Sequence, residues 1–327
     1  MATSRQGRAL AACGALLALA GCGPVIIAGP AYRGAMKEAV VDATDGWWVP
    51  WKIAVIDVDG VITDSDQTGL FSRQENAVAR FREQLQYVED DLLVEAVIVR
   101  VNSPGGGVTA SDVMYHELRA FRERSKKPVV VCVMDIGASG AYYLALAGDH
   151  VVAHPTAVVG GIGVLMQLMN VEGLFGKIGL KGETIKSGEK KDIGSPLRPM
   201  TDEERVLLQE IVDSLHTRFV TLITERRSGL DEAAVRELAD GRVYTAEEAL
   251  KLRLIDQIGY LADAAEKAKG LADITKARLV MYHRPLGYKA TAYSRSAPGQ
   301  VNLLNIDLGG LLPGHRPLFL YLWAPGQ

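Results

Sequence analysis

The sequence has 327 residues, of which 48% are hydrophobic and 23% charged, and its formal net charge at pH 7 is −3. This composition is typical of one large or two small globular domains, and it excludes wholesale disorder and a protein with many membrane spans. The slightly acidic charge gives no reason to expect a nucleic-acid partner, and three scattered cysteines and six dispersed histidines give none to expect a metal site.

The N-terminus has the pattern of an export signal. Arg5 and Arg8 precede an apolar, uncharged run over 9–20, which ends in Leu-Ala-Gly-Cys22. A basic start, an apolar stretch of ~7–15 residues and small residues at the cut are typical of secretory signal peptides. The ending resembles the bacterial lipobox, whose cysteine is lipidated. We expect residues 1–21 to be a lipoprotein signal peptide and Cys22 the lipid anchor, which would hold the folded domain on the extracytoplasmic side of a cell membrane. An uncleaved anchor helix is the alternative.

The next residues predict a tether. Residues 22–51 contain several glycines and prolines and end in an aromatic cluster of Trp47, Trp48 and Trp51. Tryptophan is favoured at membrane interfaces, which fits a membrane-proximal position. We expect a single folded domain over 52–286, because no internal repeat is visible.

From residue 52 the pattern alternates between strand and helix. Short runs rich in valine and isoleucine are typical of strands that are buried on both faces of a parallel sheet. They occur at 53–58, 96–101, 129–134 and 150–153, with helical stretches at 76–88 and 111–125 between them. Such alternation predicts an α/β fold with helical crossovers. Cys132 lies inside one of these runs and is expected to be a buried small hydrophobe.

After Pro199 the chain is expected to be mainly helical. Thr201 begins a capping box with Glu204, and apolar residues then repeat every four positions along one helix face. These residues are Leu207, Ile211, Leu215 and Phe219. Shorter helices are predicted at 232–238 and 246–252. The tail, 287–327, contains an apolar run at 317–323 that we expect to be a strand or a docking peptide covered by other protein surface, such as a neighbouring subunit.

One motif suggests phosphatase chemistry. Asp57-Val-Asp59-Gly follows a predicted strand and resembles the DxDG signature of haloacid-dehalogenase-type phosphatases. That chemistry also needs a later lysine and a downstream acidic pair at a strand end, and Asp90-Asp91 lies in the wrong place. Aspartate as a turn former after a strand is the simpler interpretation.

Three other segments together predict acyl-transfer chemistry. The glycines of Asn102–Gly107 follow a strand and precede a helix, where backbone N–H groups can stabilise an oxyanion. Ser139 lies among small residues at a strand-to-helix turn, although it could be a plain helix N-cap. The polar loop 186–196 contains several lysines. It could be a solvated charged loop, or it could supply a general base to Ser139.

The three segments resemble the signal peptide peptidase family (SppA or protease IV). They read Asn-Ser-Pro-Gly-Gly-Gly at 102–107, Ala-Ser-Gly-Ala-Tyr-Tyr at 138–143 and Lys-Ser-Gly-Glu-Lys-Lys-Asp-Ile-Gly-Ser-Pro at 186–196. The resemblance implies a membrane-bound Ser/Lys endopeptidase of the ClpP/crotonase fold, a repeated β-β-α superhelix with a helical C-terminal part. It implies homo-oligomeric rings, no cofactor, and signal-peptide remnants or other apolar peptides as substrates.

Residue roles follow from the same resemblance. Ser139 matches the nucleophile, Lys191 the general base, and Gly106 and Gly140 the oxyanion donors. A lysine is a base only when neutral, and active sites lower a free pKa of ~10.4 to ~7–8 by desolvation. Lys191 is therefore expected to be shielded from water by the fold, by substrate or by a partner subunit.

Other interpretations remain open. The family usually has serine where this chain has Gly161, and that hydroxyl normally orients the lysine, so water or Ser187 must replace it or activity is reduced. This departure motivates a non-catalytic scaffold or chaperone-like ring as the alternative function. His150 and His154 could supply a histidine base instead. A crotonase-type acyl-CoA enzyme shares the fold, but an exported protein would meet no CoA.

Overall fold

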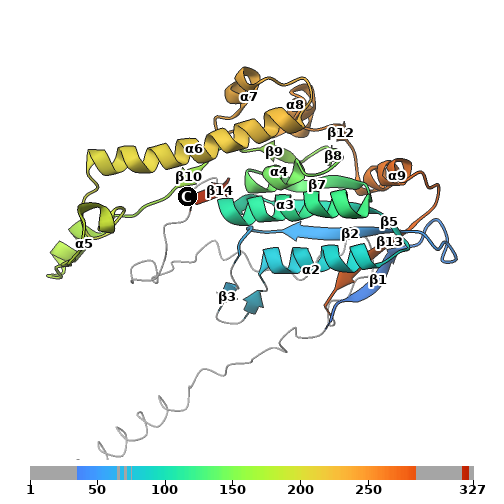
Figure 1. Cartoon of the computed structure of the whole chain (residues 1–327), viewed down its shortest axis with the longest axis horizontal. Coiled ribbons are helices and arrows are strands. Elements are labelled where there is room, and N and C mark those ends of the chain that lie inside the picture. The colour runs from blue at the N-terminus through green and yellow to red at the C-terminus, as the bar shows by residue number, and fades with distance from the viewer. Residues whose placement is uncertain (1–34, 65–66, 70–71, 75, 285–318, 324–327) are drawn as a thin grey trace, which may run out of the picture.

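The computed structural model describes residues 35–64, 67–69, 72–74, 76–284 and 319–323 (Figure 1). The predicted signal peptide over 1–21, Cys22 and most of the predicted tail lie outside the described residues. The strands are β1 (Lys37–Asp42), β2 (Lys52–Asp59), β3 (Gln67–Gly69), β4 (Ser72–Gln74), β5 (Val94–Ser103), β6 (Gly105–Gly107), β7 (Val129–Ala138), β8 (His150–Ala153), β9 (Val158–Gly160), β10 (Leu165–Met166), β11 (Val243–Thr245), β12 (Gln257–Ile258), β13 (Arg278–His283) and β14 (Phe319–Leu322). The helices are α2 (Ala77–Asp90), α3 (Val108–Ser125), α4 (Gly140–Ala145), α5 (Glu172–Lys177), the 3₁₀ helix η1 (Glu189–Asp192), α6 (Asp202–Arg226), α7 (Glu232–Leu238), α8 (Ala246–Lys251) and α9 (Leu261–Leu271).

A mostly parallel sheet forms the centre of the molecule, in the order β1-β13-β2-β5-β7-β8-β12, with β9 pairing with the end of β7. Strands β2, β5, β7 and β8 pair in parallel and contain the four predicted valine- and isoleucine-rich runs. The predicted α/β class is confirmed. Strands β5 and β7 are longer than predicted, because both continue into the polar and glycine-containing residues that form the site.

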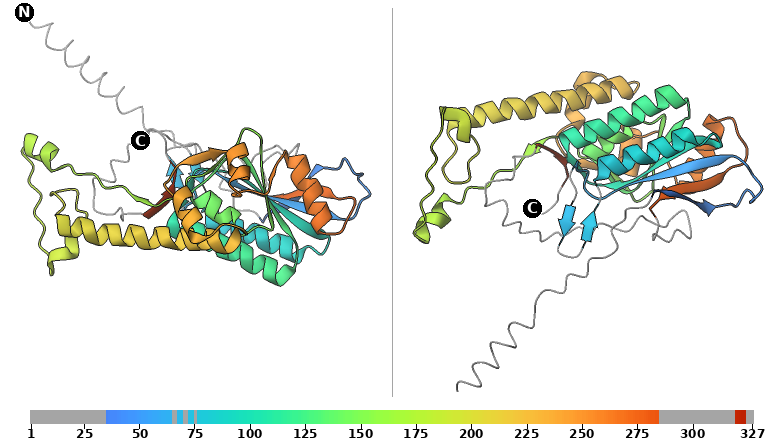
Figure 2. Two further views of the ribbon diagram at one scale, coloured as in Figure 1. Left: turned by 90° about the horizontal axis from the view of Figure 1, so that it is seen from above. Right: turned by 60° about the horizontal axis from the view of Figure 1, so that its bottom comes forward.

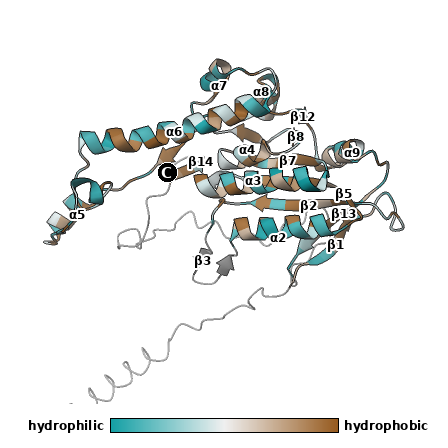
Figure 3. Ribbon diagram, viewed as in Figure 1, coloured by the Kyte–Doolittle hydropathy of each residue, from teal (hydrophilic) through white to brown (hydrophobic). Residues whose placement is uncertain are grey.

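Both faces of the sheet are buried, as the continuous apolar runs predict. Successive side chains of a strand point to opposite faces, so Ile56 and Val99 join the core beneath α2, α3 and α4, whereas Ile53 and Ile98 join the core beneath α9. Cys132 belongs to the second core as a free, fully buried thiol, and burial raises its pKa to about 12. In Figure 3 the central strands carry hydrophobic colours, while helices such as α2 and α6 alternate.

Among the strands that the pattern did not indicate, two extend the sheet beyond β2. Residues 37–42, expected within the tether, form β1, which pairs antiparallel with β13. Strand β13 itself lies parallel to β2, more than two hundred positions away in the sequence. The folded domain therefore begins earlier than its first strong apolar run. Trp47 and Trp48, in the loop after β1, are 70% and 82% exposed.

Helix α6 begins as predicted but packs over only part of its length. Thr201 and Glu204 form both hydrogen bonds of the capping box, at 3.2 and 3.0 Å. Of the predicted apolar face, Phe219 is buried, whereas Leu207 and Ile211 are 37% and 43% exposed. Figures 1 and 2 show the reason: the first turns of α6 project from the body together with α5 and the loop between them. We call residues 166–200 the arm.

The apolar run in the tail, predicted to be a strand or a docking peptide, forms a strand. Strand β14 lies between β6 and β10 in a three-stranded sheet and pairs antiparallel with both. Tyr321 on β14 has no exposed surface, so the body of the same chain covers it. Within the described residues, no helix is both long and apolar enough to cross a bilayer.

Candidate functional site

Ser139 lies at the turn between β7 and α4, in an unusual backbone conformation. Its φ is 56° and its ψ is −118°, a region that L-residues avoid and that recurs at functional sites. Its N–H donates a 2.6 Å hydrogen bond to the carbonyl of Gly160, which holds the turn. The residue occupies the N-cap position of α4, yet its hydroxyl caps nothing. The plain N-cap interpretation is therefore wrong.

The Ser139 hydroxyl is buried without a partner. The residue is 1% exposed, and among the described residues no group accepts or donates a hydrogen bond to its Oγ. A buried unsatisfied hydroxyl costs about 1–3 kcal/mol, so proteins rarely keep one without a use. The hydroxyl is therefore available to a group that binds beside it.

The glycine-rich segment forms a short strand, β6, rather than only a turn before a helix. The Gly107 N–H donates to the carbonyl of Ile62, and the Gly105 carbonyl accepts from the Ile62 N–H, at 2.9 and 2.8 Å. Because N–H groups alternate in direction along a strand, the Gly106 N–H points away from Ile62. It faces the opposite edge of β6, which pairs with an extended strand, β14.

Glycine is required where β6 approaches the Ser139 turn. A Cβ on Gly105 would lie 2.7 Å from the backbone nitrogen of Gly140, and a Cβ on Gly140 would lie 2.2 Å from the Oγ of Ser111. Side chains cannot occupy either space. The structure thus brings Gly140, the residue after Ser139, against the strand that contains Gly106, as the predicted oxyanion site requires.

Lys191 lies on the arm, in η1, away from Ser139. Figures 1 and 2 show that the arm projects from the body, whereas α4 lies within it. The Lys191 side chain is exposed and has no ion-pair partner among the described residues. Its neighbours are engaged: Lys186 pairs with Asp192 at 2.7 Å and Lys190 with Glu203 at 2.5 Å. The single chain does not bring the predicted base beside the predicted nucleophile.

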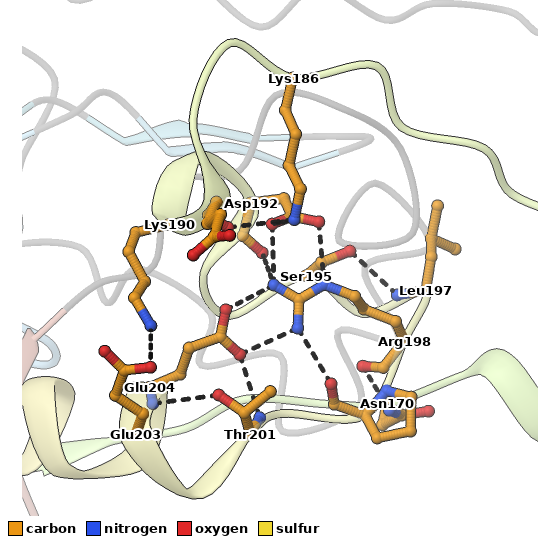
Figure 4. A network of polar contacts seen from close by, with 12 residues as sticks. Asn170, Lys186, Lys190, Asp192, Ser195, Leu197, Arg198, Thr201, Glu203 and Glu204 are labelled. Atoms are coloured by element: carbon orange, nitrogen blue, oxygen red, sulfur yellow. Dashed lines mark hydrogen bonds and ion pairs between the residues drawn. The ribbon is translucent and has the colours of Figure 1, made fainter.

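A polar network fixes the loop that carries Lys191 (Figure 4). Arg198 donates to Asp192 at 2.7 Å and to Glu204 at 2.5 Å, so one guanidinium joins η1 to the first turn of α6. Hydrogen bonds from Arg198 are the main reason that the pKa of Glu204 falls to about 2 and that of Asp192 lies far below its usual range. Both groups stay charged at neutral pH. The network fixes η1 in a position where the Lys191 side chain is exposed.

Gly161 lies directly beside the Ser139 turn. A Cβ at this position would lie 3.3 Å from the Ser139 nitrogen and 3.4 Å from the Cβ of Trp323, and its φ of 59° disfavours a side chain. A serine here would therefore be close to the predicted nucleophile, as in the family pattern. Ser187, one expected replacement for the missing hydroxyl, is exposed on the arm instead.

The competing site residues have structural partners. Asp57, weighed as a phosphatase nucleophile, is buried in a two-bond ion pair with Arg100 at 2.7 and 2.9 Å. His150 lies 3.2 Å from the side-chain oxygen of Gln257, and burial lowers its pKa. His154 lies 2.9 Å from the Thr156 hydroxyl and packs edge-on to a tyrosine ring. Neither histidine contacts the Ser139 hydroxyl.

Sequence reasoning did not indicate that three aromatic residues pack together beside the site. Tyr143, Phe219 and Tyr321 pack together, with ring centroids 4.9 to 5.3 Å apart. Each lies in a predicted element or motif, but no local pattern indicates that a distant strand will dock against the other two. Among the described residues, no group of three or more His, Cys, Asp and Glu side chains could hold a metal ion.

Two protein families and several curated proteins are similar to this chain. Peptidase family S49 matches residues 121–275, and Clp protease matches residues 58–159. A putative signal peptide peptidase SppA of Enterococcus faecium is 36% identical over 231 residues, which cover 71% of this chain and 67% of that protein. A putative protease of Methanocaldococcus jannaschii is 39% identical over 65% of this chain and 68% of its own length. Protease 4 of Salmonella typhi is 32% identical over 70% of this chain and 36% of its own length.

Proposed function

We propose a Ser/Lys mechanism for this chain, which belongs to peptidase family S49 and is a serine protease. In this endopeptidase Ser139 is the nucleophile and Lys191 is the general base. The observation that carries this assignment is the Ser139 hydroxyl, which is buried and unpartnered on a strained turn. Gly106 and Gly140 are the proposed oxyanion donors. The substrates are remnants of cleaved signal peptides and other apolar peptides, by analogy with the named SppA relative.

The proposed reaction uses the backbone N–H groups of Gly106 and Gly140. A neutral lysine amine takes the proton of the Ser139 hydroxyl while Oγ bonds to the substrate carbonyl carbon. The resulting oxyanion accepts hydrogen bonds from the Gly106 and Gly140 N–H groups, which cost no reorganisation because the fold fixes them. The lysine then returns the proton to the leaving amine as the C–N bond breaks. Water activated by the same lysine hydrolyses the acyl-enzyme.

The position of Lys191 favours a site shared between copies of the chain. An exposed lysine on a projecting arm is well placed to enter a neighbouring subunit, and burial there would remove its hydration and favour the neutral amine. Several apolar side chains of the arm and of the first turns of α6 are also uncovered. We propose a homo-oligomeric ring in which each arm supplies Lys191 to the Ser139 of the next subunit.

Membrane association is the remaining part of the proposal. It rests on the lipobox-like sequence that ends in Cys22, which lies outside the described residues, and on the exposed Trp47 and Trp48. Tryptophan side chains favour the interface between headgroups and hydrocarbon. A lipidated Cys22 would hold the peptidase on the extracytoplasmic side, close to apolar peptides in the membrane.

Gly161 supports one alternative. Without the hydroxyl that usually orients the lysine, the fold could serve as a non-catalytic scaffold or chaperone-like ring. The two functions differ in whether the Ser139 hydroxyl is nucleophilic. A fluorophosphonate probe would label Ser139 of an active peptidase and would leave a scaffold unlabelled.

Single substitutions test the assignment directly. We expect Ser139→Ala and Lys191→Ala each to reduce hydrolysis of a signal-peptide substrate by about 10⁴-fold or more, since members of a catalytic unit are not separable. Lys190→Ala is the matched control, because that lysine pairs with Glu203 on the surface. His154→Ala should also retain activity. Loss of activity in His154→Ala with retention in Lys191→Ala would contradict the Ser/Lys assignment.

A further inference from the structure

The chain places its own strand β14 on the glycine strand that bears the proposed oxyanion donor. Leu320, Tyr321 and Leu322 pair antiparallel with Gly107, Gly106 and Gly105, in that order. On its other edge β14 pairs with β10. Extended peptides bind many proteins in this way, by adding a strand to a free sheet edge. Strand β14 therefore has the geometry of a bound peptide.

The register directs one carbonyl of β14 to the proposed oxyanion donor. The N–H of Gly106 points away from Ile62 and so toward its partner in the ladder, which is Tyr321. Pairing continues in the same register, since the Trp323 N–H donates to the Pro104 carbonyl at 2.9 Å. The Tyr321 carbonyl oxygen would also lie 3.2 Å from a Cβ on Gly140, the residue that follows Ser139. A substrate carbonyl about to be attacked needs this position.

The Tyr321 side chain fills an aromatic pocket. Its ring stacks on Tyr143 at 5.3 Å between centroids and lies 4.9 Å from Phe219. Its hydroxyl donates a 2.9 Å hydrogen bond to the Leu215 carbonyl. The pocket walls come from α4, directly after Ser139, and from α6. A pocket that adjoins the nucleophile and has both an aromatic wall and a polar end suits tyrosine.

The residues after Tyr321 lie close to the turn that carries the nucleophile. Trp323 lies beside Gly161, whose own position is against the Ser139 turn. Leu322 and Trp323 also line a cavity of about 390 Å³ together with Gly161, His216 and neighbouring residues. Ser139 is 1% exposed with β14 in place, and an incoming peptide can pair with the same edge of β6 only if β14 leaves it.

From these contacts we propose that Phe319–Trp323 form a tethered pseudosubstrate, which occupies the peptide-binding groove and must be displaced before a substrate binds. The Tyr321–Leu322 bond takes the place of the bond to be cut, and the pocket of Tyr321 selects an aromatic side chain before that bond. The inference rests on the proposed function of Ser139. A segment on the same chain competes at an effective concentration of millimolar order, so it should strongly inhibit peptides at micromolar concentration.

Binding without turnover tests the groove. In a Ser139→Ala background, a site for a specific protease is inserted between residues 300 and 305, so that the chain folds intact and is cut afterwards. A fluorescent peptide of residues 317–325 is added, and anisotropy is measured before and after the cut. We expect binding only after the cut. Replacing tyrosine by alanine in the peptide should weaken binding at least tenfold, whereas phenylalanine should restore most of it and alanine at the Leu320 position should cost less. Equal binding before and after the cut, or equal binding of the alanine peptide, would overturn the proposal.

Activity provides the second measurement. In the wild-type background, cutting at the same site should raise kcat/KM by about tenfold or more for a peptide with tyrosine before the cleaved bond, and less for one with alanine there. If Ser139 is not a nucleophile, neither form hydrolyses peptide, yet the binding result still stands. If the pseudosubstrate proposal is wrong, the intact and the cut chain hydrolyse both peptides equally. The two failures are therefore distinguishable.

Discussion

At the scale of single residues, Ser139 combines two unfavourable features. Its φ of 56° places a side chain where glycine is preferred, and its hydroxyl is buried without a partner. Each feature costs stability, of the order of 1–3 kcal/mol. The hydrogen bond from its N–H to Gly160 and the packing of α4 hold the turn in this conformation. Such a cost is typical of active sites, where stability is exchanged for function.

We predict that Ser139→Ala and Ser139→Gly are both more stable than the wild type. Alanine removes the unpartnered hydroxyl, and glycine also relieves the backbone, so glycine should exceed alanine by about 1 kcal/mol. For a chain of this size, that corresponds to about 1–2 °C in the thermal midpoint. Ser111→Ala is the control: its hydroxyl donates to the Gly107 carbonyl at 2.9 Å, so its loss should destabilise. A glycine variant that melts below the wild type would contradict the strain argument.

The site residues differ in how far sequence could predict them. Ser139, Gly106 and Gly140 lie in short motifs that directly follow strongly apolar strands. Chain connectivity alone therefore places them at the carboxyl ends of neighbouring parallel strands. Tyr321 could not be placed, since the choice of its pairing strand depends on the free edges of β6 and β10 and on the shape of a pocket built by α4 and α6. These are properties of the folded body.

At the scale of elements, the arm is held by charge rather than by a core. Arg198 joins Asp192 in η1 to Glu204 in the first turn of α6. Glu204 also completes the capping box with Thr201, so one carboxylate serves both the helix start and the loop. The sequence predicted the capping box from local spacing, but it gave no indication that Arg198 would bridge the two elements.

We predict that Arg198→Gln lowers the thermal midpoint at neutral pH and that the difference disappears in acid. The pKa of Glu204 is lowered to about 2 from its usual 4.5, so its contribution is complete above pH 4.5 and is lost as the pH falls toward 2. The Asp192 pKa is lowered in the same direction. Thermal unfolding at several pH values between 2 and 7 measures the effect, with Arg205→Gln, an exposed position on α6, as control. An undiminished difference at the lowest pH would argue against the ionic network.

At the scale of the whole molecule, alternation of apolar runs and helices predicted the central layers. Four strands and most helices appear close to their expected bounds because each is encoded by its own periodicity. Strands β1, β9, β11, β12 and β13 of the same sheet were missed, since each pairs with a strand from a distant part of the chain. The same limit applies to the arm, several of whose apolar side chains stay exposed among the described residues.

The uncovered apolar residues of the arm and α6 argue for contact between copies. Monomeric proteins rarely expose a large contiguous apolar patch. The exposed residues here are Met169, Leu174, Ile178, Leu180, Ile185, Val206, Leu207 and Ile211. They lie on the same projecting part of the molecule as Lys191 (Figure 2). Burial of this surface against a neighbour would bring Lys191 into a desolvated environment at the same time.

Complementation between two inactive variants tests the shared site. Ser139→Ala keeps the lysine and Lys191→Ala keeps the serine, so neither is active alone under the proposed mechanism. If each site uses a serine from one subunit and a lysine from the next, a randomly mixed 1:1 ring restores about a quarter of the sites, because both neighbours must be of the right kind. We therefore expect co-expressed variants to regain about a quarter of wild-type activity on a peptide substrate. If both residues came from one chain, no mixture would regain activity, and a ring of Lys190→Ala with Ser139→Ala shows how far an inactive partner alone reduces the rate.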